Sequence, residues 1–132
     1  MDCIEIIIVK NGRHQLAQLL CDSKNLTITF VLDDEYSKAY SGSDLYDCFG
    51  LVRKDNSNLT FLCKGSKVNV HPSTMSSQMT LGVKAYELTM GKSAQRSDLV
   101  NIFDYEEDNL TNDPEVQHDF YMRWVESDLL DS

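Results

Sequence analysis

The feature that most constrains the fold of this 132-residue chain is its β-rich amino-terminal third, which carries an Asn-Gly turn signal. Residues 2–9 are rich in Ile, and β-branched side chains favour a strand. Asn11-Gly12 follows, and this dipeptide between two apolar stretches is typical of a tight hairpin. Residues 14–21 fit either a strand or two helical turns, and the hairpin favours the strand. Residues 26–32 read as a third strand, so we predict a three-stranded antiparallel meander.

A helix and further strands are predicted after the meander. Residues 33–42 are expected to form a polar loop, and Ser43 is a good N-cap for a helix over residues 44–55. The apolar side chains of that helix recur at helical spacing and would pack on the sheet. Residues 59–64 and 83–88 are predicted as strands. We therefore expect an α+β fold with a mostly antiparallel sheet of about five strands, whose order after the helix no turn signal fixes.

The carboxy-terminal part is predicted to end in a helix. Residues 97–103 resemble a short helix or turn, and an acidic loop follows over residues 104–112. Asp113-Pro114-Glu115 is a strong helix start, because an acidic residue can cap the helix and proline fits its first position. The predicted helix covers residues 114–127. Three apolar side chains at helical spacing are expected to pin it to the core: Val116, Phe120 and Trp124.

The net charge of −9 is concentrated at one end of what we predict to be a single α+β domain, residues 1–132. Residues 98–132 form an acidic, helix-rich end with 11 acidic residues and one basic residue, whereas residues 1–97 hold 10 acidic and 11 basic residues. Such a surface repels nucleic acid and anionic membranes and attracts basic proteins by long-range steering. The alternative is a solvated acidic surface that keeps the protein soluble. We expect neither a nucleic-acid nor a membrane partner.

Hydropathy and cysteine usage indicate a cytoplasmic protein. The hydrophobic fraction of 42% is that of a globular domain, and the longest apolar run, residues 6–9, is far too short to span a membrane. The amino-terminal residues lack the basic stretch of an export signal. Four widely spaced cysteines are typical of core thiols in a reducing compartment: Cys3, Cys21, Cys48 and Cys63. No zinc-ligand spacing and no Gly-rich phosphate loop occurs, so we expect no metal and no cofactor.

One pair of side chains is open to a catalytic interpretation. Cys63 and His71, with Asn69 between them, could form a thiol-dependent site, which needs a thiolate, an imidazole and an orienting amide. Four cysteines and three histidines make such a pairing easy to find by chance. The alternative is a buried thiol and a loop histidine without chemistry.

A second segment is open to a binding interpretation. Residues 68–78 have no periodicity and are expected to form the longest loop, and its part 71–78 combines a proline with four hydroxyl side chains. Long loops often carry function. The alternative is that Met75 and Met79 simply plug the edge of the core.

Three segments resemble a pattern in small bacterial proteins. They are Gly65–Met79 (GSKVNVHPSTMSSQM), Gly82–Leu88 (GVKAYEL) and Asp98–Asp104 (DLVNIFD), together with Phe120 and Trp124. The resemblance covers about residues 59–126 and departs from the pattern at Thr74, where a small residue such as Gly is expected. Such proteins are similar to the single-domain immunity proteins that accompany polymorphic or contact-dependent toxins. The resemblance implies inhibition of a toxin by binding. It assigns a functional role to no particular residue of this chain.

These observations together predict a non-enzymatic binding protein of a bacterial cytoplasm. The most favoured function is that of an immunity protein, which neutralises a cognate toxin domain of basic, nuclease type. The expected contacts are six acidic side chains that steer the partner and one aromatic anchor: Asp104, Glu106, Glu107, Asp108, Asp113 and Glu115, with Tyr105 as the anchor. The alternatives are an adaptor domain of a larger assembly and, less favoured, a thiol-dependent enzyme that uses Cys63 and His71. The sequence fixes neither the toxin nor the oligomeric state.

Overall fold

The structure is a computed structural model, and it describes residues 1–33 and 36–131. Within these residues the fold is α+β, as predicted, with eight strands and three α-helices. The strands are β1 (Asp2–Lys10), β2 (Arg13–Asp22), β3 (Thr27–Leu32), β4 (Tyr36–Ser41), β5 (Thr60–Phe61), β6 (Val70–His71), β7 (Lys84–Glu87) and β8 (Leu99–Asn101). The helices are α1 (Leu45–Asp55), α2 (Thr74–Thr80) and α3 (Pro114–Asp131), with short 3₁₀ helices η1 (Lys64–Ser66) and η2 (Arg96–Asp98).

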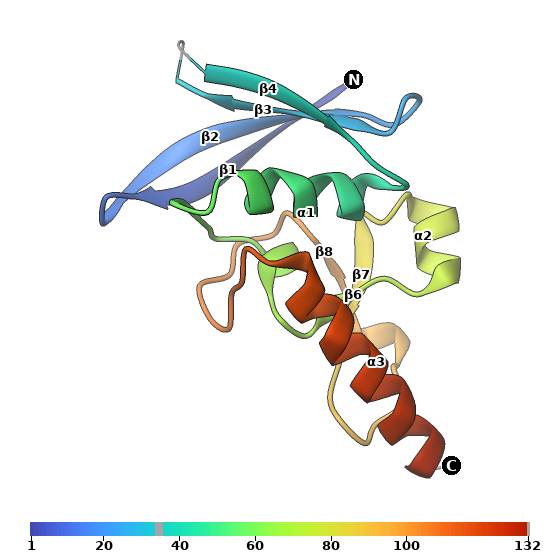
Figure 1. Ribbon diagram of the computed structural model, residues 1–132. Coiled ribbons are helices and arrows are strands. Elements are labelled where there is room, and N and C mark those ends of the chain that lie inside the picture. Colours follow the sequence, from blue (N-terminus) through green and yellow to red (C-terminus); the bar gives the residue numbers. More distant parts are fainter. Residues whose placement is uncertain (34–35, 132) are drawn as a thin grey trace.

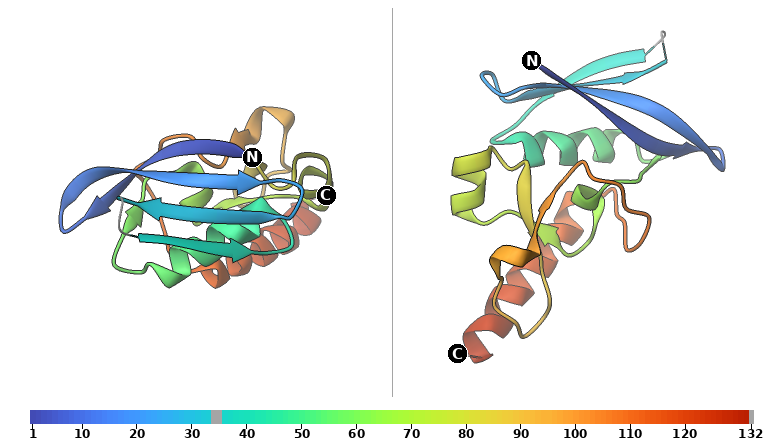
Figure 2. Two further views of the ribbon diagram at one scale, coloured as in Figure 1. Left: turned by 90° about the horizontal axis from the view of Figure 1, so that it is seen from above. Right: turned by 180° about the vertical axis from the view of Figure 1, so that it is seen from behind.

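Two antiparallel sheets lie on opposite sides of α1 (Figures 1 and 2). A five-stranded sheet in the order β4-β3-β2-β1-β5 curls over one face of this helix. A three-stranded sheet in the order β6-β7-β8 lies on the other side, together with α2 and α3. The amino terminus lies at the large sheet and α3 runs away from it, so the two ends of the chain are far apart (Figure 1).

The predicted meander is confirmed as β1, β2 and β3. Asn11 and Gly12 have φ angles of 52° and 75°, so both turn residues are left-handed, as the hairpin signal requires. The register that follows pairs Ile6 with Ala17 and Ile8 with Gln15. It turns Ile6, Ile8 and Leu19 toward the core, where they are at most 3% exposed.

The polar loop predicted over residues 33–42 is wrong, because most of it forms the edge strand β4, which pairs with β3. An edge strand with one face in solvent needs few apolar side chains, and in β4 only Tyr40 is buried. Strand β4 is held by polar contacts with the end of α1 rather than by many buried apolar side chains. The Asp55 carboxylate accepts hydrogen bonds from Lys38 Nζ at 2.8 Å and from the Tyr40 hydroxyl at 2.5 Å.

The predicted helix over residues 44–55 is confirmed as α1, but its N-cap is Asp44 and not Ser43. Asp44 has an extended backbone, and its side chain accepts a hydrogen bond from Asp47 N at 2.7 Å. The four apolar side chains that recur at helical spacing are buried as expected: Leu45, Cys48, Phe49 and Val52. They fill the space between the helix and the large sheet.

The segment between the sheets contains more regular structure than predicted. The strand expected over residues 59–64 shrinks to β5, which pairs with the end of β1. The expected loop over residues 68–78 is wrong, because it holds β6 and most of α2. Two of its hydroxyl side chains form a capping box: Ser73 Oγ accepts from Ser76 N at 3.0 Å, and Ser76 Oγ accepts from Ser73 N at 2.9 Å.

Two details of this segment correct the sequence interpretation. Met75 and Met79 are 68% and 78% exposed, so they do not plug the core edge. Thr74 is the first residue of α2, so no glycine turn occurs there. The strand predicted over residues 83–88 is confirmed as β7. The short helix or turn predicted over residues 97–103 is in part the strand β8, which pairs with β7.

The last helix begins where predicted, and of its three expected core side chains Phe120 and Trp124 are partly buried whereas Val116 is not. Asp113 Oδ1 accepts a hydrogen bond from Glu115 N at 2.9 Å, and α3 continues to Asp131. Val116, expected in the core, is 38% exposed, whereas Gln117 is 1% exposed. Gln117 is buried because its amide binds the buried side chain of Arg53 on α1. Gln117 Oε1 lies 2.6 Å from Arg53 Nη2.

The Gln117 amide also ties α3 to η1. Its Nε2 donates to Gly65 O at 2.9 Å and to Lys67 O at 2.7 Å. A polar anchor takes the place expected of Val116, while the partly buried Trp124 donates from its Nε1 to Lys92 O at 2.8 Å. Among the helices of the described residues, none combines the length and the hydropathy needed to cross a membrane.

Candidate functional site

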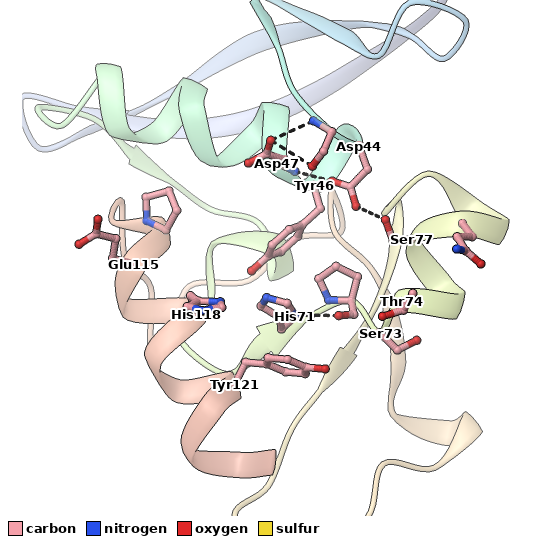
Figure 3. A pocket seen from close by; sticks show the side chains of 14 residues that line it. Asp44, Tyr46, Asp47, His71, Ser73, Thr74, Ser77, Glu115, His118 and Tyr121 are labelled. Atoms are coloured by element: carbon pink, nitrogen blue, oxygen red, sulfur yellow. Dashed lines mark hydrogen bonds between the residues drawn. The ribbon is translucent and has the colours of Figure 1, made fainter. Parts of the chain in front are cut away.

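A cleft of about 630 Å³ opens where the amino-terminal ends of three helices meet β6 (Figure 3). Its walls are formed by side chains from residues 43–47 at the start of α1, 71–78 around α2, and 114–121 at the start of α3. The cleft is open to solvent and lined by both aromatic and acidic groups. Three other hollows on the described residues are smaller, at about 390, 220 and 190 Å³.

One wall of the cleft is a column of three rings. The His71 imidazole stacks on the Tyr121 ring with a centroid distance of 4.1 Å and an interplanar angle of 12°. Tyr46 lies on the other side of the imidazole at 5.4 Å. The Tyr46 hydroxyl donates to Val70 O at 2.7 Å, which fixes the end of the column to β6. The column joins α1, β6 and α3, so the wall is rigid.

The protonation state of His71 follows from its surroundings. His71 Nδ1 lies 2.7 Å from Pro72 O, and because a carbonyl only accepts, Nδ1 carries the proton. Burial lowers the pKa of His71 from its ordinary value, and His118 lowers it further. The ring is therefore neutral near pH 7. Within the described residues Nε2 makes no hydrogen bond, which leaves it as an acceptor.

The second wall carries the carboxylates of α1. Asp44 is only 6% exposed and accepts a hydrogen bond from the Ser77 hydroxyl at 2.5 Å in addition to that from Asp47 N. Asp47 Oδ2 accepts from Ser43 N at 3.0 Å. Gly82 makes this close packing possible, because a Cβ there would lie 2.7 Å from Asp44 Oδ2. Neither carboxylate forms an ion pair among the described residues.

The third wall is the first turns of α3. Glu115 and His118 are exposed there and line the cleft, and Tyr121 completes the ring column (Figure 3). Neither Lys nor Arg lines the cleft within the described residues. The cleft therefore combines three carboxylates with the imidazoles of His71 and His118, and no Lys or Arg side chain of the described residues balances them.

Most of the predicted contact residues lie elsewhere, on the loop that precedes α3. Asp104, Tyr105, Glu107 and Asp108 are exposed on this loop. The ring of Tyr105 is 50% exposed, and its hydroxyl donates to Glu107 Oε2 at 2.9 Å. These four side chains are thus available to a partner, as the prediction requires.

Glu106 has a different place from its neighbours. Its side chain is 16% exposed and lies 2.9 Å from Lys67 Nζ and 3.4 Å from Lys64 Nζ. The hydrogen bond from Lys67 lowers the pKa of Glu106 to about 2. Glu106 is therefore neutralised by two lysines and holds the loop against η1, rather than facing a partner.

The two remaining predicted residues lie at the start of α3. Asp113 is exposed and caps the helix, and Glu115 reaches the rim of the cleft. Glu115 is the one predicted contact residue that lines the cleft. The sequence interpretation missed Asp44, Tyr46, His118 and Tyr121. The only local signal was the spacing of His118 and Tyr121, which puts both on one side of a helix.

The alternative site at Cys63 and His71 does not have the environment of a reactive thiol. Cys63 is 0% exposed, and burial raises the pKa of its thiol to about 12. The thiol is thus protonated in the core, while His71 lines the cleft. Cys21 and Cys48 are also buried, as expected for core thiols, whereas Cys3 is exposed. The described part of the chain shows no group of three or more metal-ligating side chains.

Neither a protein-family model nor a curated protein sequence matches this chain, so its function has to be inferred from its own side chains.

Proposed function

We propose that this protein is a non-enzymatic binding protein, an immunity protein that neutralises a basic, nuclease-type toxin domain in the bacterial cytoplasm. The observation that carries the proposal is the acidic segment, defined as residues 104–115. Five exposed carboxylates of this segment form no ion pair within the described chain: Asp104, Glu107, Asp108, Asp113 and Glu115.

Unpaired carboxylates favour a basic partner. Charges of one sign that are not balanced within the protein create a field that speeds the approach of the opposite charge, and salt screens this field. A nuclease domain must present basic groups to nucleic acid, so its active surface matches the acidic segment. An inhibitor that covers this surface needs no catalytic residue of its own.

The acidic segment is also held in a fixed shape. Main-chain hydrogen bonds join both ends of the loop to the 3₁₀ helix η1. Lys64 N donates to Asp104 O at 2.8 Å, and Thr111 N donates to Ser66 O at 2.8 Å. The Glu106 ion pairs add a third fixed point. A segment that is already ordered loses little conformational entropy on binding, which favours tight complexes.

The proposal is tested by capturing the partner and then changing the charge of the segment. The protein is used as bait at low and moderate salt, the captured protein is identified by mass spectrometry, and its toxicity is measured with and without the present protein. We expect a basic domain whose toxic activity is abolished by stoichiometric binding. Capture of a non-toxic assembly component would instead support the adaptor interpretation.

The matched variants remove two charges each. Glu107→Gln/Asp108→Asn changes the acidic segment, and Asp2→Asn/Glu5→Gln changes two exposed carboxylates at the large sheet. We expect the first pair to slow association about tenfold at low salt and the second to leave it nearly unchanged. Equal association rates for the two double variants would remove the acidic segment from the proposal.

A further inference from the structure

The cleft differs from the acidic segment in having walls, and this makes it suited to a single inserted side chain. Its volume of about 630 Å³ exceeds that of any amino-acid side chain, and it combines the ring column with polar groups on the facing walls. Clefts that bind ligands are usually of this kind, with apolar surface and a few fixed polar groups.

The charge of the cleft selects between a cation and an anion. The starts of α1 and α3 each contribute roughly half a positive charge, which alone would favour an anion. Three carboxylates, those of Asp44, Asp47 and Glu115, outweigh this contribution and leave an excess of negative charge. A cation is therefore preferred, even though Asp44 and Asp47 also cap α1.

The arrangement of acceptors selects among cations. His71 and Asp47 come from two different walls, and Glu115 adds a carboxylate at the rim of the cleft that is turned outward, away from both (Figure 3). A guanidinium group is planar and carries five N–H donors, so it can meet acceptors on several sides at once, whereas the compact ammonium of lysine is more strongly hydrated. The alkyl stem of arginine can pack along the ring column.

We infer that the cleft is a receptor for one arginine side chain presented by the protein partner. This inference rests on the proposed function, since it supplies a specific contact for the partner that the acidic segment steers. The acidic segment acts over a distance, while the cleft holds the complex once it has formed. Apart from Glu115, which belongs to both, the two parts of the surface should therefore affect different rate constants.

The experiment uses a probe that does not depend on the partner. N-acetyl-arginine amide is titrated into the protein, and the ring signals of His71 and His118 are followed by NMR. N-acetyl-citrulline amide is the control, because it has nearly the shape of arginine but no charge. We expect saturable shifts with arginine in the millimolar range, weaker binding of the corresponding lysine amide, and no specific binding of citrulline.

Two variants locate the binding. Glu115→Gln removes an exposed carboxylate on the rim, so folding is preserved, and we expect it to weaken arginine binding about fivefold. Glu126→Gln is the matched change of an exposed carboxylate on α3 outside both the cleft and the acidic segment, and it should leave arginine binding unaltered. Equal binding of arginine and citrulline, no binding of either, or an equal effect of the two variants would overturn the inference.

The outcome also separates this inference from the proposed function. If a basic toxin is captured and inhibited but arginine does not bind the cleft, the immunity function is supported and the inferred arginine receptor is rejected. If arginine binds but no toxin is found, the receptor stands and the immunity function fails. With the captured partner, Glu115→Gln should raise the dissociation rate, whereas Glu107→Gln/Asp108→Asn should lower the association rate.

Discussion

The replacement Gln117→Leu should be among the most destabilising single changes on the surface of α3 that faces the core. Gln117 Oε1 is the one side-chain acceptor for the Arg53 guanidinium within the described residues, at 2.6 Å from Nη2. Arg53 is 0% exposed and pairs with no carboxylate there; its Nε donates to Thr111 O at 3.2 Å, and its Nη1 is unpartnered. Leucine fills a similar volume and removes the acceptor.

The expected loss can be worked out from these contacts. A hydrogen bond to a buried charged group contributes about 1.5–3 kcal/mol. The Gly65 carbonyl also loses its donor, and a buried unsatisfied acceptor costs about 1–3 kcal/mol. Burial lowers the pKa of Arg53 to about 10, so the guanidinium stays charged near pH 7 and cannot escape the penalty by deprotonation. We expect a loss of about 3–5 kcal/mol, which lowers Tm by about 10–20 °C.

Urea unfolding followed by the fluorescence of the single tryptophan, Trp124, and by far-UV circular dichroism measures this loss. Gln18→Leu is the matched control, because Gln18 is exposed and the same change there should cost under about 0.5 kcal/mol. Adding Arg53→Met to Gln117→Leu should recover part of the loss, since an apolar pair has no buried charge to satisfy. A loss below about 1 kcal/mol for Gln117→Leu would refute the role given to this contact.

Three further changes test other parts of the structure. Because the pKa of Glu106 is lowered to about 2, its ion pairs stabilise the fold fully above about pH 4.5, and this stabilisation is lost as the pH falls toward 2. The free energy of unfolding of Glu106→Gln should therefore depend less on pH in this window. An unchanged acid transition would contradict this role. A thiol reagent at neutral pH should label Cys3 in the folded protein but Cys63 only on unfolding, which mass spectrometry of the labelled peptides can check. Gly82→Ala should destabilise the protein by about 2–4 kcal/mol in urea unfolding, more than Gly91→Ala, because both have a positive φ but only at Gly82 does a Cβ meet Asp44.

The sequence predicts those parts of the fold that depend on neighbouring residues. The meander follows from one Asn-Gly turn, and α1 follows from four apolar side chains at helical spacing. Strand β4 was missed because an edge strand needs no apolar alternation. Helix α2 was missed because its capping hydroxyls, Ser73 and Ser76, are typical of loops as well. On α3 the prediction was wrong at Val116, because a buried arginine on another helix draws Gln117 inward in its place.

The candidate site was harder to predict than the fold. The acidic segment is contiguous, so its exposed carboxylates could be named from the sequence, except that Glu106 turns toward two lysines from a different segment. The cleft joins side chains from three segments that are far apart in the chain. Without the order of the strands, nothing in the sequence places Tyr46, His71 and Tyr121 in one column.

Because α3 follows the large sheet in the sequence, it affects when the growing chain becomes able to bind a partner in the cleft. A chain that leaves the ribosome at about 5–20 residues per second can form the hairpins of the large sheet early, because their contacts are local. The third wall of the cleft comes from residues 114–121, which are made well after those hairpins. A nascent or prematurely terminated chain that lacks α3 would hold the folded sheet but no complete cleft. Capture of a partner through the cleft would thus be delayed until residues 114–121 had been translated.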